Sequence, residues 1–481
     1  MNGKLNVAWA FCVAMMLCPP AHAWDVVNGL TTPLEDPLLT RPPVLDTGKI
    51  LPGDTAPISC PEVQVEGGPL TLADAVNVAL CRNPQVRGAW AAIKVQAAAV
   101  GEARAAYLPT LSLNASPTKD RTWYPGASQA YPETTVKAVG VYASLNWRLF
   151  DFGGRQADRH AANDLLDAAL ANHDAALQKA LTDVIQAYFD AQTARAAWTA
   201  QQEDEVLARR TLEATQHRER RGVNSQGDTL QATTALAKVS LEKGRAQGAY
   251  EKAISVLVYA LGMPATTQLS LADNDLVDGT ASIREDLTDW LTQAQARHPA
   301  IVAAQAQLAA AEEKVTSTRA EGLPTVDLMA NFYQNGRPNQ GLPTVRTRET
   351  LVGLTLTIPL FDGFSRTYKV RGAQAQAEQK EADLEDTQRQ VLMDVVKAHA
   401  DAVASLDNLD ASQRLLSAAQ ASLATMQRQY DKGAADVLQI LTAQTTLSDA
   451  QQERIRCLAD WRSARLRLLA AAGGLGLQDA R

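Results

Sequence analysis

The residues of this chain that could carry out chemistry are few and scattered. The sequence contains no phosphate-binding loop, neither the H-E-x-x-H nor the G-x-S-x-G signature, and no cysteines at metal-ligand spacing. Among the six histidines, His399 falls in a helical apolar pattern, where a packed core residue is more common than a metal ligand. We therefore expect no enzymatic activity, no metal site and no cofactor.

The cysteines offer one covalent reaction, which is disulfide formation. Residues 1–23 have the basic start, the apolar run and the small-x-small end, Ala21-His22-Ala23, of a secretory signal peptide. Its removal would leave Cys60, Cys81 and Cys457 in an oxidising compartment. Cys60 and Cys81 then either form a disulfide, which we favour, or remain two free thiols. Cys457 lies in a helical pattern and is expected to be a buried, small apolar residue.

Composition limits the class of partner. The net charge is -7, so no basic surface indicates nucleic-acid binding. Residues 24–68 are rich in proline and predict an extended N-terminal segment. The rest of the chain has no apolar run of about 18 residues, the minimum for a membrane-spanning helix. If the chain enters a membrane, it should do so as β-strands.

The elements that must position any site occur twice. Pro84 and Pro299 begin matching segments that are 215 residues apart, and the matching residues Leu149 and Leu360 are 211 apart. Two copies of one unit therefore make up most of the chain. We place the copies at residues 69–275 and 284–478.

Each copy contains one β-hairpin, expected at residues 110–150 and 325–361. Apolar residues alternate with polar or small ones over both segments, which predicts strands with one apolar face. We expect Trp147 and Ile358 on the apolar face and Asn146 and Thr357 on the opposite face.

The remaining residues predict long helices with a coiled-coil seam. Neither proline nor glycine occurs between Arg155 and Glu219, so one helix of roughly 65 residues would be about 100 Å long. Residues in a 4-3-4-3 spacing predict the buried seam. In the first copy these are Leu177, Leu181, Val184, Tyr188 and Ala191, and in the second Leu392, Val395, His399, Ala402, Leu406 and Leu409.

A repeated motif marks the change from strand to helix. It is written LFDFGGR at 149–155 and LFDGFSR at 360–366. The glycines permit a sharp bend, and each aspartate can cap the new helix. We interpret the motif as architectural; its residues are Phe150, Asp151, Gly153, Phe361, Asp362 and Gly363.

Four strands cannot close a barrel, and open sheet edges do not occur in lipid. Several chains should therefore share one barrel, which has eight strands for two chains or twelve for three. The alternative of another class is a soluble periplasmic coiled-coil scaffold, which the matched apolar strand faces oppose.

Taken together, the doubled unit, the LFD strand ends and the helix turns RRGVNSQGDTLQA and DKGAADVLQILTA resemble the TolC family over residues 69–478. Details are similar to its CyaE-type branch, which serves type I secretion of a toxin. The resemblance implies a mixed α and β membrane protein: a homotrimer whose 12-stranded β-barrel, four strands per chain, lies in the outer membrane of a Gram-negative bacterium. A coiled-coil helical barrel would continue it through the periplasm.

The resemblance also implies partners and a site. A periplasmic membrane-fusion adaptor would contact the helix turns and link them to an inner-membrane ABC or proton-driven transporter. The contact residues would be Gly222, Val223, Gly433 and Ala434, and the tunnel entrance would include Asp228, Tyr430, Asp436 and Gln439.

The second helix turn departs from the family pattern. Ala435 replaces an arginine of the best-known member, and Gln439 and Thr442 replace its two ring aspartates. Asp436 either forms a weaker acidic ring or is an ordinary acid at a helix N-terminus. Type I protein secretion is the favoured function, with multidrug or metal efflux as the alternative.

Overall fold

The computed structural model describes residues 38, 68–122, 134–272, 286–335 and 347–475. These residues divide between two compact units. The first unit includes Ala97–Arg159 and Leu323–Leu360 and holds the strands of the described residues; the second is helical. No helix in the described ranges has both the length and the hydropathy needed to cross a bilayer.

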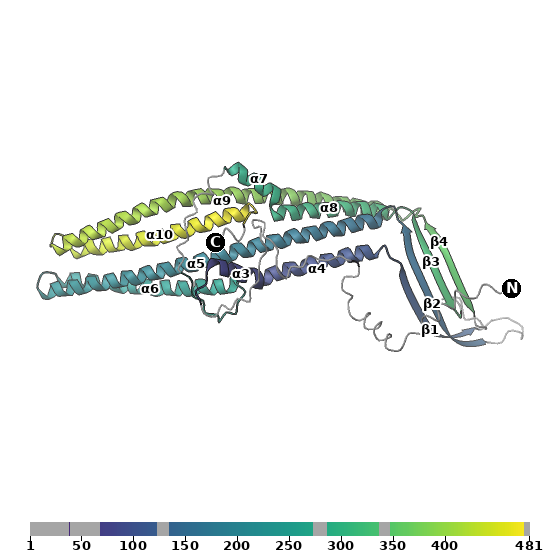
Figure 1. The fold of residues 1–481 in the computed structure, drawn as a ribbon, viewed down its shortest axis with the longest axis horizontal. Coiled ribbons are helices and arrows are strands. Elements are labelled where there is room, and N and C mark those ends of the chain that lie inside the picture. Colours follow the sequence, from purple (N-terminus) through teal and green to yellow (C-terminus); the bar gives the residue numbers. More distant parts are fainter. Residues whose placement is uncertain (1–37, 39–67, 123–133, 273–285, 336–346, 476–481) are drawn as a thin grey trace. The chain divides into compact units, whose positions relative to one another are not determined.

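The sheet of the first unit combines two hairpins that are distant in sequence. Its strands are β1 (Thr110–Thr122), β2 (Thr134–Phe150), β3 (Thr325–Gln334) and β4 (Arg348–Thr357). They pair in the order β1-β2-β3-β4 and all pairs are antiparallel (Figure 1). The last strand ends before the predicted limit at residue 361. The physical reason is Pro359, which has no N–H to donate to a ladder.

The two faces of the sheet differ in chemistry. In register across the four strands, Leu111 lies opposite Leu145, Leu145 opposite Ala330, and Ala330 opposite Val352, so one face is a continuous apolar surface. On the two outer strands these side chains are exposed in the single chain, Leu111 at 76% and Val352 at 67%, whereas Leu145 and Ala330 are half-buried. Trp147 lies on the same face, opposite Leu328.

The opposite face is mostly polar. Ser112 and Ser144 share a hydrogen bond of 2.6 Å, and Arg148 pairs with Asp327 at 2.9 Å. The rings of Tyr142 and Tyr333 stack with their centroids 5.7 Å apart. Asn146 and Thr357 share this face by register, whereas Ile358 follows the end of β4.

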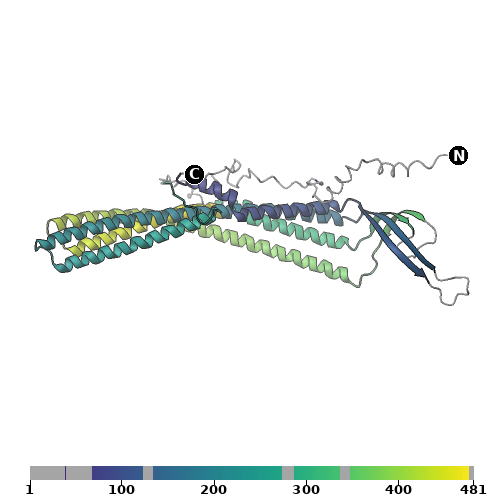
Figure 2. The same cartoon turned by 90° about the horizontal axis from the view of Figure 1, so that it is seen from below.

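The helices of the described residues form two series of equal lengths. The first series is α3 (Leu72–Arg82), α4 (Pro84–Ala105), α5 (Gly154–Arg220) and α6 (Gln226–Ala260), with 11, 22, 67 and 35 residues. The second is α7 (Leu287–Arg297), α8 (Pro299–Ala320), α9 (Ser365–Asp431) and α10 (Val437–Ala471), also with 11, 22, 67 and 35 residues. In the second unit, α10 runs back along α9 after a short turn (Figure 2).

Apolar side chains of the second unit form two large cores, and a smaller third cluster lies around Tyr430. The seam predicted for the first copy is confirmed, because Leu177, Leu181, Val184, Tyr188 and Ala191 are all buried. The Tyr188 hydroxyl also donates to the Leu70 carbonyl at 3.1 Å.

The seam predicted for the second copy is only half right. Val395, Ala402 and Leu409 are buried at seven-residue spacing, but His399 is only partly buried and lies outside the second core. The other buried positions of this seam include Ser405 and Ser412, which are also seven residues apart. Because serine is polar, a search for apolar spacing does not find these positions.

Candidate functional site

The candidate site is the pair of helix turns that join α5 to α6 and α9 to α10. In the first turn Gly222 has a φ of 76°, its N–H donates to the Glu219 carbonyl, and the Val223 N–H donates to Arg218. In the second turn Gly433 has a φ of 77° and the same two-bond pattern. This is a Schellman ending, which requires a left-handed residue after the helix and explains both glycines.

Each turn leads into a helix that begins with a capping box. In α6, Ser225 accepts from the Asp228 N–H while the Asp228 carboxylate accepts from the Ser225 N–H. In α10, Asp436 and Gln439 exchange the same pair of bonds. Three polar residues predicted at an entrance therefore satisfy their own helix ends.

Tyr430 is the residue that brings the two turns together. It is 5% exposed and packs on Val437 and Ile440. From the other turn, Arg218 lies 3.9 Å from the centre of the Tyr430 ring and donates to its carbonyl at 2.8 Å, and the Asn224 amide donates to its hydroxyl at 3.3 Å. A cation over an aromatic face, shielded from water, is a stabilising contact.

Sequence reasoning missed Arg218 and Asn224. Neither residue has a signal of its own, since a basic residue in the last turn of a helix and an asparagine in a turn are common. Only the distance between the two turns in space identifies their partner. The predicted residues Gly222, Val223, Gly433 and Ala434 are all exposed on these turns.

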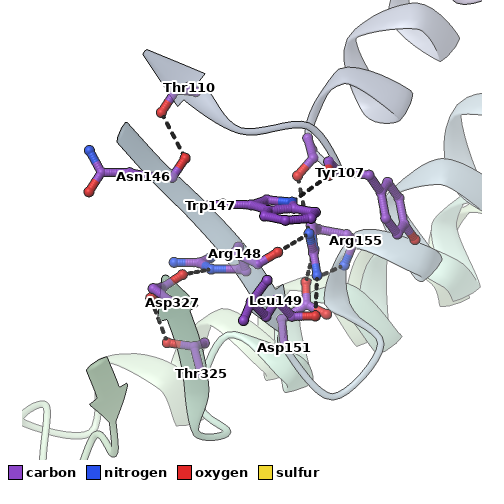
Figure 3. A network of polar contacts seen from close by, with 11 residues as sticks. Tyr107, Thr110, Asn146, Trp147, Arg148, Leu149, Asp151, Arg155, Thr325 and Asp327 are labelled. Carbon is purple, nitrogen blue, oxygen red and sulfur yellow. Dashed lines mark hydrogen bonds and ion pairs between the residues drawn. The ribbon is translucent and has the colours of Figure 1, made fainter. Parts of the chain in front are cut away.

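The first strand-to-helix turn has a network around Arg155 (Figure 3). The Asp151 carboxylate accepts from the backbone N–H and from the Nε of Arg155, both at 2.9 Å. The same guanidinium donates to the carbonyls of Arg148, Leu149 and Ala106. Gly153 has a φ of 90°. The aspartate thus caps the helix, and the arginine donates to two carbonyls at the end of β2 and to one that precedes β1.

The second strand-to-helix turn uses the same residue types. The Asp362 carboxylate accepts from the Arg366 N–H at 2.9 Å, and the Arg366 guanidinium donates to the Gly322 carbonyl. Gly363 has a φ of 68°, and Phe361 meets Phe364 edge to face. The arginine recurs at the same place in both motifs, and this repetition is the sequence signal for its role.

The cysteines separate into two kinds. Cys81 is disulfide-bonded. Its predicted partner, Cys60, lies outside the described residues, so the Cys60–Cys81 pairing stays a prediction. Cys457 is 7% exposed and free, which confirms the expectation of a buried thiol. Burial raises the pKa of this thiol, which keeps it in the neutral form.

A titratable contact joins α5 and α10. The Ser448 hydroxyl donates to the Asp204 carboxylate at 2.6 Å, and the Gln201 amide donates to Ser448 at 3.4 Å. Burial raises the pKa of Asp204; the Ser448 hydrogen bond opposes this shift, and the charges of Glu203 and Asp449 reinforce it. Folding therefore shifts this carboxyl group toward its neutral form relative to the unfolded chain.

We expect Asp204→Asn to raise the melting temperature at neutral pH. A raised folded-state pKa means that the folded chain binds more protons than the unfolded chain, so stability falls as pH rises between the two pKa values. The amide keeps an acceptor for Ser448 and removes the charge. Thermal unfolding between pH 4 and 8 measures this, with exposed Asp386→Asn as the control. A lower melting temperature for Asp204→Asn at neutral pH would contradict the prediction.

Comparison with known proteins gives consistent similarities. The family model described as outer membrane efflux protein matches residues 75–263 and 290–474. The chain is 38% identical to protein CyaE of Bordetella pertussis over 438 residues, covering 91% of this chain and 90% of CyaE. It is 24% identical to the alkaline protease secretion protein AprF of Pseudomonas aeruginosa, covering 85% and 86%.

Solved structures share the fold. The outer membrane protein VceC from Vibrio cholerae superimposes with a TM-score of 0.72 at 21% identity, over 84% of this chain and 96% of VceC. At this identity the likeness concerns the fold alone.

Proposed function

Since this chain belongs to the outer membrane efflux protein family, we propose that it works as the outer-membrane component of a three-part system for type I protein secretion. The chain is an outer-membrane exit duct for export, with an extension in the periplasm. The family is one of export channels.

The sheet supports insertion as part of a shared barrel. Its apolar face exposes Leu111, Leu113, Val352 and Leu354 in the single chain, and burial in lipid removes that surface from water. Among the described residues, strands β1 and β4 each have one unpaired edge, and such edges must be paired in a membrane. We propose that three chains pair edge to edge into 12 strands, with the polar face toward the lumen.

The paired helix turns support adaptor docking. Gly222 and Gly433 are exposed, and a Cβ added at either would contact nothing within 4 Å, so another chain can approach the backbone closely. Val223, at 70% exposed, and Leu438, at 59%, add apolar surface. We propose that these turns, together with Ala434, contact the periplasmic adaptor, and that the adaptor links the duct to an inner-membrane transporter.

The residues proposed for the tunnel entrance differ in the roles that their contacts allow. Asp228, Asp436 and Gln439 remain proposed entrance residues, but their bonds within capping boxes limit them to weak contacts with cargo or ions. Tyr430 is buried against Arg218. We propose that Tyr430 holds the helix pair α5–α6 against the helix pair α9–α10 of the same chain, and that it does not line the tunnel entrance.

The observation that favours protein cargo is the pattern of similarity. Identity is 38% with CyaE, and it is 24% with both AprF and the pyoverdine export protein OpmQ of Pseudomonas aeruginosa, so the CyaE match carries the preference. AprF and PrtF, also similar over most of the chain, are both described by their secretion of proteases. Protein secretion is therefore preferred to small-molecule efflux.

Deletion of the gene should remove a specific protein from the culture medium, and the wild-type gene should restore it. Quantitative proteomics of the medium measures the loss, and growth with dyes, detergents and metal salts measures efflux. An unchanged set of secreted proteins with new sensitivity to small toxic molecules would favour efflux. Recovery of the chain in the salt-extractable periplasmic fraction would favour the scaffold.

A further inference from the structure

A cluster of aromatic and cationic side chains borders the apolar face of the sheet. The Trp147 indole Nε1 donates to the Tyr107 carbonyl at 2.9 Å (Figure 3). The Tyr107 ring has the guanidinium of Arg155 4.8 Å from its centre and that of Arg159 5.7 Å away. All four residues belong to the sheet-containing unit.

The two arginines differ in how much of their hydrogen-bonding capacity is used. Arg155 is paired with Asp151 and donates to three carbonyls, so its charge is balanced. Within the part of the chain that the structure describes, neither the Arg159 guanidinium nor the Tyr107 hydroxyl has a hydrogen-bond partner. Five N–H donors and one hydroxyl are thus left at one place.

The second copy shows that this pair is not required for the turn. There the positions of Tyr107 and Arg159 are taken by Gly322 and Val370, yet the strand-to-helix turn keeps its aspartate and arginine. In the second copy the Arg366 side chain occupies the space beside Gly322 instead. The turn therefore forms without this pair, which leaves Tyr107 and Arg159 available for a further role, once in each chain.

The position of the cluster identifies a chemical class of partner. Trp147 is 39% exposed on the apolar face. Tyr107, which accepts its hydrogen bond, lies at the same end of the sheet, just before β1 begins. In a chain inserted by its apolar face, this is the level where acyl chains give way to phosphate groups. Tryptophan and tyrosine prefer that level, and a basic residue there attracts anionic lipid.

We propose that Arg159 and the Tyr107 hydroxyl bind the phosphate of an anionic phospholipid in the leaflet next to the periplasm, with the acyl chains lying on the apolar face beside Trp147. The site rests on the proposed insertion of the sheet in the outer membrane. One lipid would bind to each chain, at the copy that carries both residues.

Native mass spectrometry of the detergent-purified protein, titrated with phosphatidylglycerol or phosphatidylcholine, tests the site. The wild type should retain about one phosphatidylglycerol per chain and less phosphatidylcholine. Arg159→Gln should weaken phosphatidylglycerol binding about fivefold, the change expected for one basic group near an anionic surface. Arg159→Lys should retain most of the affinity.

Arg348→Gln is the matched control, because it removes the same charge at the opposite end of the strands and should bind as the wild type does. Equal phosphatidylglycerol binding by Arg159→Gln and the wild type would overturn the site, as would equal affinity for the two lipids. Protection against thermal unfolding by inorganic phosphate alone, equal to that by lipid, would show a site for free anions instead. A wild type that lacks selective lipid but fractionates with the outer membrane would refute this site and leave the proposed function intact.

Discussion

Gly433→Trp is expected to abolish export while leaving the amount of assembled protein in the outer membrane unchanged. Gly433 has a φ of 77°, is exposed, and has open space where its side chain would begin. The indole would therefore project from the turn without displacing other residues. The left-handed backbone costs a non-glycine residue about 1–2 kcal/mol, which two helices of 67 and 35 residues can absorb.

Gly433→Ala separates the two effects, because it has the same backbone strain without the bulk. Secretion of cargo into the medium and the level of cross-linked oligomer in outer-membrane fractions should be measured for both variants. The alanine variant should export nearly as the wild type does. Normal export from a fully assembled Gly433→Trp protein would show that the adaptor docks elsewhere, and loss of the oligomer would show a folding role.

Val352→Arg should remove most of the protein from the outer membrane. Val352 lies near the middle of β4 on the apolar face, opposite Ala330, and is 67% exposed in the single chain. An arginine facing lipid near the bilayer centre costs about 2–4 kcal/mol, and each chain of an oligomer would carry one. Outer-membrane fractions should show a loss of tenfold or more, as about 1.4 kcal/mol per factor of ten implies.

Leu351→Arg is the matched control, one residue away on the polar face opposite Asn331. Its guanidinium would face water in the lumen, so the protein level should stay close to that of the wild type. Equal loss from both variants would contradict the assignment of faces. A greater loss from Leu351→Arg would show that the two faces are exchanged.

The strands were predictable because their signal is local. Alternation in the segment that holds Leu145 and Trp147 has a period of two, and pairing with β3 preserves it across the sheet. The first helical seam was predictable for the same reason, since Leu177 to Ala191 repeat an apolar spacing. Local patterns of this kind need no knowledge of what lies opposite.

The rest depended on residues that meet only in space. Ser405 and Ser412 are buried in the helical seam, but an apolar pattern cannot identify serines. The sequence therefore predicted His399 at a seam position that it does not occupy. Arg218 finds Tyr430 more than 200 residues away, at 2.8 Å from its carbonyl. Burial between helices raises the pKa of Asp204, the charge of Asp449 on another helix adds to this shift, and the Ser448 hydrogen bond opposes it. Residue type alone gives no such partner.

The equal lengths of the two helix series fix which residues of the first series meet those of the second at the helix turns. Tyr188 is fixed in the first core, and Arg218, farther along α5, must arrive beside Tyr430 of α9. One residue inserted between Tyr188 and Arg218 would advance the arginine by about 1.5 Å and rotate it by roughly 100° around the helix axis. The guanidinium would then leave the tyrosine ring. Drift in the length of one 67-residue helix is therefore tolerable only with a matching change in the other, so the two halves must evolve in step although their sequences diverge.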